Sequence, residues 1–321
     1  MSQEIRLERQ VPIINSGQRF DQVAVELFPQ YSRARLQSWM RSGDLLLGGK
    51  VAKPNTRVLG GEVLMLATLL HAEGEWEAQA MDLDILYEDD QILVINKAAG
   101  VVVHPAAGNP DGTLLNALLH HVPQVQMVPR AGIVHRLDKD TSGLMVVAKT
   151  LEAQNHLVKQ LQARTVSRQY EAIAQGVPRA EGTVDAPIGR HPRQRTRMAV
   201  VDLGGKEAVT HYRVVESLGA FSRLRVKLET GRTHQIRVHM AHIGHPLVGD
   251  PVYGGKPKLT GLSHDVATAL RAFPRQALHA AQLGLIHPQT GTREQWRAPL
   301  PDDMAHLLAV LAECAEEGDG A

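Results

Sequence analysis

The sequence predicts an α+β protein in which a small N-terminal unit precedes a larger domain. At 321 residues the chain is long enough for two domains with at least one sizeable core. Apolar residues recur at helix spacing in some segments and at strand spacing in others. A stretch rich in Ala, Glu, Gly and His around residues 67–82 separates the two parts. We expect an N-terminal extension over residues 1–15, the small unit over 16–75, a linker over 76–82, the larger domain over 83–310 and a C-terminal tail over 311–321.

The overall composition bounds the class of protein. Basic and acidic residues nearly balance at a formal net charge of +1, so a nucleic-acid partner would have to be met by local basic patches. Cys314 is the only cysteine, which excludes an internal disulfide and a zinc site built from cysteines. No segment approaches the roughly 18 uninterrupted apolar residues of a membrane span, and residues 1–11 lack the apolar core of a signal peptide. We therefore expect a cytoplasmic protein that has no membrane partner.

The small unit is predicted to contain two helices followed by strands. Helical spacing over residues 21–28 ends at Pro29. Ser32 can cap a second helix that ends near Gly43. A hairpin is expected over residues 45–51 around the Gly48-Gly49 turn, and a last strand over 62–66.

Basic residues gather on the second helix and on the hairpin of this unit. They are Arg33, Arg35 and Arg41 on the helix and its end, and Lys50, Lys53 and Arg57 in the hairpin region. A basic helix beside a basic hairpin is typical of a protein that binds a phosphate backbone. A solvated helix face accounts for the composition equally well.

The larger domain is predicted to alternate strands with short helices. Strands are expected over residues 85–87, 92–96, 168–174 and 224–228, and a capped helix over 111–119. Thr150 can cap a helix that carries Leu157 and Leu161. Thr233 can cap another, with Ile236 and Met240 toward the core.

A polar loop over residues 132–144 is the first candidate for chemistry. Apolar runs of strand length bracket it, so a rigid sheet can hold its carboxylate, guanidinium and imidazole groups in place. Asp138 is the central carboxylate. A purely structural role, in which Asp138 pairs with Arg136 or Lys139, is the alternative that the loop alone leaves open.

Two further segments carry candidate residues. Tyr170 alternates with Ala172 and Ala174 along one face of a strand, which leaves room above its ring, although the strand alone favours a core tyrosine. The loop over residues 189–200 contains Arg190, Arg193, Arg195 and Arg197 with no acidic residue between them. Four arginines in one loop repel one another unless a polyanion binds there.

Four histidines, His234, His239, His242 and His245, raise the question of a metal site. His239 and His242 are three residues apart on a predicted helix, which is compatible with ligation. No Glu accompanies them in the spacing of zinc peptidases. The sequence therefore predicts no metal and favours capping and RNA contacts for these side chains.

Three motifs of the larger domain resemble those of one enzyme family. His-Arg-Leu-Asp-x-x-Thr-Ser-Gly over residues 135–143 resembles the catalytic loop of the pseudouridine synthases of the RluA type, which modify ribosomal RNA. The segments over 87–105 and 228–254 are also similar to that family, with Ala98 where the family usually has Pro. The loss of this proline loosens a turn and removes no chemistry.

The small unit resembles the S4 RNA-binding domain. The resemblance rests on Arg19-Phe20-Asp21, on Tyr31-Ser32-Arg33-x-Arg35-Leu36 and on Gly60-Gly61-Glu62, with Gly48 where an Asn is usual. It implies that Arg33, Arg35, Arg41 and Lys50 contact RNA. Together the two resemblances imply an S4-like domain followed by a catalytic domain whose mixed, largely antiparallel central sheet is flanked by helices.

The resemblance also implies roles for individual residues. Asp138 would be the catalytic aspartate, Tyr170 would stack on the target uracil, and Arg237 would pair with Asp138 and keep it ionised. Arg136 would fill the space that a flipped uridine vacates. Further contacts to the substrate would come from His135, Thr141, Arg232 and the arginines at 190, 193, 195 and 197.

The implied reaction is the isomerisation of uridine to pseudouridine in 23S ribosomal RNA, with the helix 69 hairpin as the expected target. An isomerisation needs no net electron or proton, so no cofactor, nucleotide or other, is expected, and a monomer is the expected state. Two first steps remain open for Asp138, attack on the nucleotide or removal of a ribose proton. Free RNA and an assembled large subunit remain open as substrates. The competing class is a non-enzymatic RNA-binding protein that uses the S4-like unit alone.

Overall fold

The computed structural model describes residues 2–29, 31, 33–71, 76–106, 108–194, 196–255 and 259–318. The helices are α1 (Phe20–Leu27), α2 (Arg33–Ser42), α3 (Leu114–His121), α4 (Leu151–Gln162), α5 (Gln235–His242), α6 (His264–Ala272) and α7 (Asp302–Gly318). The strands are β1 (Ser2–Gln10), β2 (Leu45–Leu47), β3 (Val63–His71), β4 (Ile85–Glu88), β5 (Ile92–Lys97), β6 (Ser142–Ala148), β7 (Ser167–Gln175), β8 (Glu181–Asp185), β9 (Ile188–Arg190), β10 (Met198–Val200), β11 (Val209–Leu218), β12 (Phe221–Leu228), β13 (Leu278–Ile286) and β14 (Arg293–Arg297).

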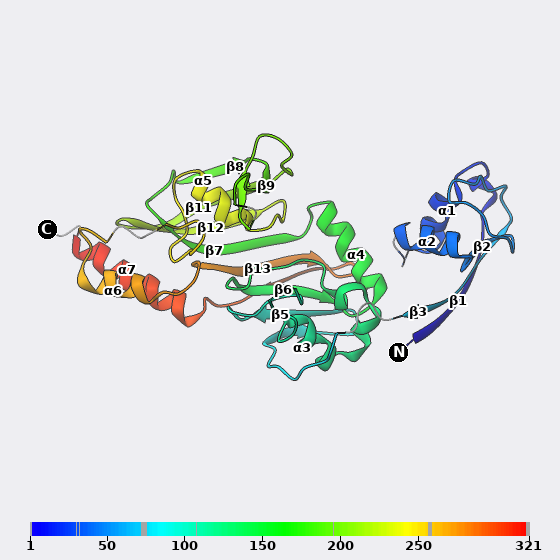
Figure 1. The fold of residues 1–321 in the computed structure, drawn as a ribbon, viewed down its shortest axis with the longest axis horizontal. Helices are drawn as coiled ribbons and strands as arrows, with labels where there is room; N and C mark the ends of the chain where they lie inside the picture. The colour runs from blue at the N-terminus through cyan, green and yellow to red at the C-terminus, as the bar shows by residue number, and fades with distance from the viewer. Residues whose placement is uncertain are drawn as a thin grey trace.

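The N-terminal unit is a small sheet, in the order β1-β3-β2, covered by α1 and α2 (Figure 1). Phe20, Leu36 and Leu64 are among the side chains buried between the helices and the sheet. The pattern over residues 1–15 did not indicate β1, which pairs with β3 along its whole length. The two apolar residues of β1, Ile5 and Leu7, pack against the core of the unit. The proposed Ser32 cap lies outside the described residues.

The predicted hairpin over residues 45–51 is only partly right. Leu47 and Lys50 exchange two backbone hydrogen bonds across the Gly48-Gly49 turn, at 2.9 and 3.1 Å. However, β2 pairs with β3 and not with the residues that follow the turn. The tight turn thus reverses the chain. Beyond these two bonds, β2 pairs with the longer apolar strand β3, because this pairing buries more apolar surface.

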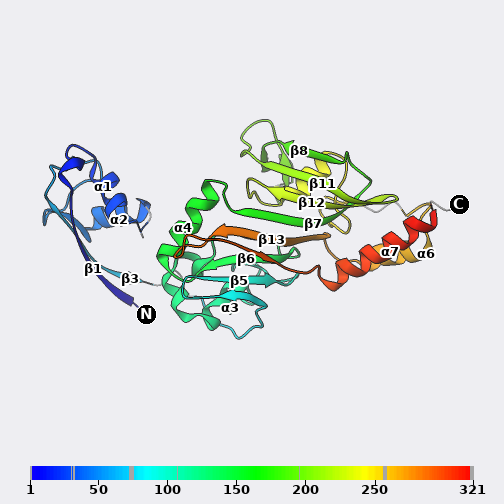
Figure 2. The same cartoon turned by 180° about the vertical axis from the view of Figure 1, so that it is seen from behind.

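The larger domain is built on one sheet, which runs in the order β4-β5-β6-β13-β7-β12-β11-β8 among the described strands, with β14 on β13 (Figure 2). Only the β6–β13 pair is parallel within that set, at Ser142 and Gly143. The other pairs are antiparallel. The prediction of a mixed, largely antiparallel sheet flanked by helices is confirmed.

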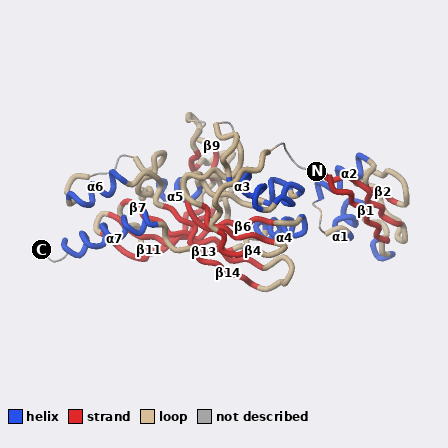
Figure 3. The backbone as a smooth tube through the Cα atoms, turned by 90° about the horizontal axis from the view of Figure 1, so that it is seen from below, coloured by secondary structure: helices blue, strands red, loops and turns tan. Residues whose placement is uncertain are grey.

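Different helices pack on the two faces of this sheet. On one face, Tyr170 and Ala172 of β7 join a core that includes Leu115 of α3 and Ile236 of α5. On the other face, Ile173 of β7 packs with α6 and α7. The α6–α7 pair and the N-terminal unit lie at opposite ends of the molecule (Figure 3).

The start of α5 differs from the prediction. Thr233 does not cap the helix; the N-cap position is His234, whose backbone is left-handed at φ 56° and whose side chain makes no capping bond. Such a conformation costs a non-glycine residue about 1–2 kcal/mol. By contrast, Thr150 caps α4 as expected, because its hydroxyl accepts a hydrogen bond from the backbone of Ala153 at 3.1 Å.

The N-terminal unit is not isolated from the larger domain. Met127 and Leu151, both from the larger domain, pack against the core of the unit. Leu151 is the first residue of α4, so the contact lies at one end of the sheet. Among the residues described, no helix is both long and apolar enough to cross a membrane.

Gly143 is a position where the fold leaves no room for a side chain. Its φ is +115°, and a Cβ atom there would lie 2.4 Å from the carbonyl oxygen of Ala280 on the neighbouring parallel strand. We expect Gly143→Ala to lower the free energy of unfolding by about 3 kcal/mol or more, since overpacking adds to backbone strain. Urea unfolding measures this. Gly219→Ala is the control because Gly219 also has positive φ, +61°, with nothing within 4 Å. An equal loss in both variants would contradict the steric explanation.

Candidate active site

A cleft of about 1210 Å³ opens on the face of the sheet that carries Tyr170. Its walls come from the polar loop, from β7, from the C-terminal half of α4 and from the turn before α5. The structure brings together in this cleft most of the residues predicted for the larger domain: His135, Arg136, Asp138, Thr141, Tyr170, Arg232 and Arg237. Arg190, Arg193 and Arg197 do not line the cleft, and Arg195 lies outside the described residues.

The guanidinium of Arg237 joins two carboxylates. Its Nη1 donates to Asp138 Oδ2 at 3.0 Å, while its Nε and Nη2 donate to the two oxygens of Asp250 at 2.7 and 2.9 Å. Arg237 and Asp250 are 5 % and 2 % exposed. Burial alone would lower the pKa of Arg237, but its hydrogen bonds to Asp250 and the charges of Asp250 and Asp138 raise it. A fixed cation therefore faces Asp138 at any ordinary pH.

Asp250 is held by the backbone as well as by Arg237. Its Oδ1 accepts hydrogen bonds from the amides of Val252 and Tyr253 at 2.9 and 3.0 Å. Burial acts to raise the pKa of Asp250, yet its bonds to Arg237 and to these amides lower it overall. A buried bidentate pair of this kind fixes the plane of the guanidinium. Asp250 thus fixes the orientation in which Arg237 directs its Nη1 group toward Asp138.

His234 lies on the other side of Asp138. Its Nε2 is 3.9 Å from Asp138 Oδ1, and its Nδ1 is 2.9 Å from the hydroxyl of Tyr253. That hydroxyl already accepts a hydrogen bond from the amide of Met198 at 3.0 Å, so its proton is available for Nδ1. The neutral tautomer with hydrogen on Nε2 satisfies both neighbours, because a bare Nε2 lone pair would repel the carboxylate. Burial lowers the pKa of His234, which favours this neutral form.

A buried lysine supports the loop that carries Asp138. Lys97 is 3 % exposed, and its ammonium donates to the carbonyls of Ala98, Val101 and Lys139 at 2.8, 2.9 and 2.9 Å. The amide of Gly100 donates to the same Lys139 carbonyl at 2.9 Å. Burial lowers the pKa of Lys97 to about 8, against the attraction of Asp140 and Asp138. The segment after β5 therefore fixes the backbone directly after the catalytic candidate.

The residues before β13 support the other end of the loop. Arg275 donates to the carbonyl of Asp140 at 3.2 Å and holds Asp303, at the start of α7, in a bidentate pair. The side-chain Nε2 of Gln276 donates to the hydroxyl of Thr141 at 3.1 Å. Thr141 is buried and lines the cleft, but its hydroxyl is committed to Gln276. Its visible role is to hold the loop.

Tyr170 presents its ring to the cleft from β7. The side chain is 6 % exposed, and burial raises the pKa of its hydroxyl, so the ring stays neutral at physiological pH. Ala172 and Ala174 occupy the same face, as the alternation of the strand predicted. A neutral aromatic ring on the wall of a cleft offers a flat surface for a base.

Two histidines of the cleft are neutral. Burial lowers the pKa of His135 to about 3, and its Nε2 accepts a hydrogen bond from the amide of Val146 at 3.1 Å. Burial and the charges of Arg130 and Arg136 lower the pKa of His104 to about 4. Among the described residues no partner reaches the buried Nε2 of His104. A buried polar atom without a partner beside a cleft is a point where a bound molecule can supply one.

The arginine loop lies beside the cleft and is attached to the site. Arg190 and Arg193 are exposed at the end of β9 and in the loop that follows. Arg197 instead donates to the carbonyl of Val252 and lies over the ring of Tyr253, with its Cζ 5.2 Å from the ring centroid. The loop is thereby tied to the segment that holds Asp250.

The basic residues predicted to contact RNA in the S4-like unit differ in whether they already interact with other side chains of the protein. Arg33 donates to Asp21 at 2.7 Å, and Arg35 lies 5.9 Å from the ring centroid of Trp39. Burial raises the pKa of Asp21, but hydrogen bonds from Arg19, Arg33 and Gln37 lower it to about 2. Arg41 and Lys50 are exposed. Arg33 therefore also holds the unit together.

The histidines of α5 do not gather around a common point. His239 is buried and bonds the hydroxyl of Thr210 and the carbonyl of Ala186, both at 2.9 Å, while His245 bonds the carbonyl of Gln175 at 3.0 Å. In the described part of the chain, no three His, Cys, Asp or Glu side chains are placed to hold a metal ion.

Comparison with known families defines the class of protein. Residues 91–242 match the model of the family described as RNA pseudouridylate synthase, and residues 18–64 match the S4 domain model. The chain belongs to the RNA pseudouridylate synthase family and is an enzyme of that kind, with an S4 domain before its catalytic domain.

Individual relatives cover nearly the whole chain. "Ribosomal large subunit pseudouridine synthase D" of Pseudomonas aeruginosa is 59 % identical over 317 residues, which are 98 % of this chain and 99 % of the relative. The protein of the same name from Escherichia coli K12 is 55 % identical, over 99 % of this chain and 98 % of the relative.

Among solved structures, "Human RNA Pseudouridylate Synthase Domain Containing 4" is 27 % identical with a TM-score of 0.56. The match covers 71 % of this chain and 92 % of that chain. "Human RNA Pseudouridylate Synthase Domain Containing 1" matches with 26 % identity and a TM-score of 0.52, over 72 % of this chain and 94 % of that chain.

The sequence did not predict the roles of four residues of the site. Lys97, Tyr253 and Asp250 were not named as site residues, and His234 was named only as a possible metal ligand, cap or RNA contact, although all four hold Asp138, its loop or Arg237 in place. The only signal for them was their position inside the three family-like segments. Spacing could not reveal them because each contact joins residues far apart along the chain.

Lys97 predicts a pH dependence of stability. Its pKa in the folded protein, about 8, is below the ordinary value of 10.5, so the unfolded chain binds more protons between these pH values. The contribution of Lys97 to stability should therefore rise with pH above about 8, by up to roughly 1.4 kcal/mol per pH unit.

The measurement is urea unfolding of the wild type and of Lys97→Met from pH 7 to pH 10.5. The difference between the two should be constant near pH 7 and move in favour of the wild type above pH 8. Lys139→Met, at a neighbouring exposed side chain, is the control and should show no such drift. A difference that stays constant across the range would contradict the burial of a charged Lys97.

Proposed function

We propose that this enzyme converts specific uridines of 23S ribosomal RNA to pseudouridine, with Asp138 as the catalytic group. The observation that carries the proposal is the Asp138 carboxylate beside Tyr170 in one large cleft, fixed by Arg237. The names of the relatives support the large-subunit RNA as substrate. The helix 69 hairpin is the target we expect, within a precursor or an assembled subunit.

The reaction breaks one bond and forms another within the same nucleotide. The bond from ribose C1′ to uracil N1 breaks, the uracil turns, and a bond from C1′ to C5 forms. The hydrogen that C5 loses is balanced by the hydrogen that N1 gains, so no redox partner is required. Asp138 starts this sequence as a carboxylate, either by attack on the nucleotide or by removal of a ribose proton, and both are compatible with its position.

The geometry of the cleft suits a base that has left its stack. A uridine inside a hairpin must flip out to reach Asp138, at a cost of a few kcal/mol. Tyr170 offers one face for the uracil, and stacking returns about 1–3 kcal/mol. Arg136 is exposed on the rim beside Asp138, where it can occupy the vacated space. Arg232 also lines the cleft, held by the carbonyl of Glu207 at 2.9 Å.

The wider setting of the enzyme follows from the same proposal. Exposed Arg190 and Arg193 face solvent beside the cleft, where RNA backbone would pass. We propose that Arg33, Arg35, Arg41 and Lys50 of the S4 domain add affinity from the far end of the molecule. We further propose a cytoplasmic monomer that uses neither a metal nor another cofactor.

Asp138→Asn tests the central assignment. The amide keeps the size of the side chain and removes its charge, so RNA should still bind while conversion falls by at least a thousandfold, as expected for loss of a group that acts in every step. The measurement is pseudouridine formation in a purified 23S rRNA fragment. Asp140→Asn is the matched control, because Asp140 contributes its backbone carbonyl to Arg275 and should stay active. Turnover by the Asp138 variant near the wild-type rate would refute the assignment.

We expect substitutions of the basic S4 residues to have different effects, according to whether the side chain also forms an ion pair within the protein. Arg41→Ala and Lys50→Ala should each weaken RNA binding and reduce the slope of log K against log salt by about 0.7–0.9, since one phosphate contact is lost. Arg33→Ala should in addition destabilise the unit, because buried Asp21 loses a partner. Binding titrations at several salt concentrations and urea unfolding separate the two effects. Unchanged salt slopes for Arg41→Ala and Lys50→Ala would contradict a role of the S4 domain in binding the RNA backbone.

A further inference from the structure

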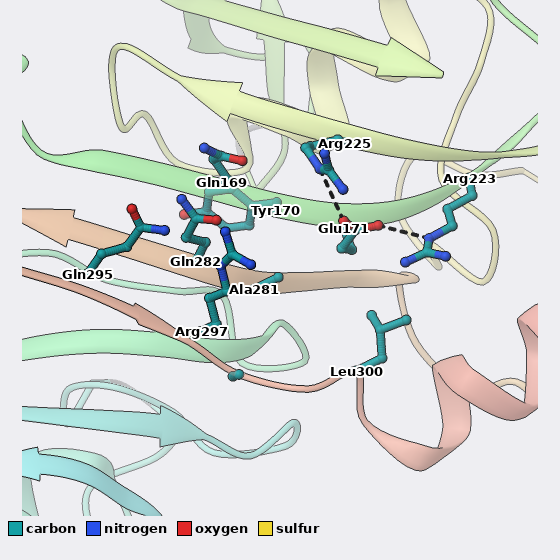
Figure 4. Close-up of a pocket in the computed structure, with 11 residues that line it drawn as sticks. Gln169, Tyr170, Glu171, Arg223, Arg225, Ala281, Gln282, Gln295, Arg297 and Leu300 are labelled. Atoms are coloured by element: carbon teal, nitrogen blue, oxygen red, sulfur yellow. Dashed lines mark hydrogen bonds and ion pairs between the residues drawn. The ribbon is translucent and has the colours of Figure 1, made fainter. Parts of the chain in front are cut away.

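A second hollow, of about 520 Å³, lies on the face of the sheet opposite the cleft. Its lining comes from β7, β12, β13 and β14 and from the segment before α7. Figure 4 shows side chains of Gln169, Gln282, Gln295 and Arg297 around it, with Arg223 and Arg225 turned toward Glu171. Because Tyr170 faces the cleft, its neighbours Gln169 and Glu171 face the other way. None of the catalytic candidates described above uses this face, except through the shared strand β7.

A row of polar side chains crosses four strands at the hollow; Arg297, Gln282 and Gln169 line it, and Lys227, which does not, continues the row on β12. Arg297 is the Cα partner of Gln282, Gln282 of Gln169, and Gln169 of Lys227. Neighbouring strands are about 4.8 Å apart, so the row spans about 14 Å. It has a cation at each end and two amides between them. That order suits a strand of RNA, whose phosphates bind cations while its base edges accept and donate to amides.

The groups that would bind are not used within the protein. In the part of the chain that the structure describes, the side chains of Gln169, Gln282, Gln295 and Arg297 have no hydrogen-bond or ion-pair partner. Glu171 is the one acid of the hollow, and it is already paired with Arg223 at 2.9 Å and Arg225 at 3.4 Å. The two arginines exceed its single negative charge, and Arg297 adds a further positive charge to the lining. Ala281 and Ala298 line the hollow with small side chains and keep it open.

We propose that this hollow is a second RNA-binding site, which takes a short single-stranded segment of the substrate RNA outside the target hairpin. The inference rests on the proposed RNA substrate and deepens it. A hairpin with its uridine at Asp138 occupies the cleft, and the sheet itself separates the two faces. The segment bound here must therefore come from a part of a longer RNA that passes around the sheet. The site adds affinity for long RNA and takes no part in the chemistry.

Arg297→Glu is the variant that tests this site. It should weaken binding to a long 23S rRNA transcript at least tenfold and lower the salt slope by about one or more. Binding and conversion of a short hairpin that carries only the target should stay within twofold of the wild type. The control is Arg271→Glu, an exposed arginine of α6 outside the hollow, which should not change binding to the long RNA more than twofold. Thermal unfolding checks that both variants fold.

Two results would overturn the proposal. One is equal binding of the long RNA by Arg297→Glu and Arg271→Glu. The other is an equal loss on the long RNA and on the hairpin, which would mean a general charge effect. Equal binding of naked RNA together with a loss of conversion only in assembled large subunits is a case of the first result, and would mean that this surface contacts the subunit without binding single-stranded RNA. Failure of the wild type to convert either RNA would instead count against the proposed function, because the binding comparison does not depend on turnover.

Discussion

The guanidinium of Arg237, held between Asp250 and Asp138, is the contact on which the rest of the site depends. A buried cation is stable only when it is paired, and loss of one partner of such a pair costs about 3–5 kcal/mol. Asp250 meets this need by accepting hydrogen bonds from Nε and Nη2 and leaves Nη1 of Arg237 for Asp138. The position of Asp138 is therefore fixed by a residue that never faces the substrate. This arrangement explains why α5 begins abruptly with a strained His234: the helix must start where Arg237 can reach both acids.

The loop that carries Asp138 is held from outside by two buried cations. Lys97 and Arg275 donate to the carbonyls of Lys139 and Asp140, the two residues that follow Asp138. Arg275 is in turn fixed by Asp303 at the start of α7. The C-terminal helix is thus mechanically connected to the catalytic loop, although it lies at the far end of the sheet. A polar loop without secondary structure gains the rigidity of the elements around it by this means.

The sequence predicted local structure well and long-range contacts poorly. Alternation placed β7 within one residue at each end, and placed the end of β12 correctly but its start three residues late. The Thr150 cap was correct because capping depends on residues three apart. The prediction that Thr233 caps α5 was wrong. The contacts of Arg237 with Asp138 and Asp250 determine where the helix starts, and they outweigh the capping preference of the threonine. The strand β1 was missed because its alternating charges resemble a solvated tail, and only its pairing with β3 makes it a strand. Asp138, Tyr170 and Arg237 could be named from motifs, whereas Asp250 and Lys97 are recognisable only once the chain is folded.

The charge of the cleft does not depend on its histidines in the physiological pH range. His104 and His135 lie beside arginines in a cleft suited to a polyanion, and protonated histidines would add to the attraction. Burial instead lowers their pKa values to about 4 and 3, so that both are neutral throughout the physiological range. The charge of the cleft is then carried by arginines, which do not titrate, and by the carboxylates that face Arg237. Neutral imidazoles can still recognise the base or ribose by hydrogen bonds, and the unpartnered Nε2 of His104 is placed to do so. The charge that the cleft presents therefore does not depend on the protonation of these two histidines in the physiological pH range.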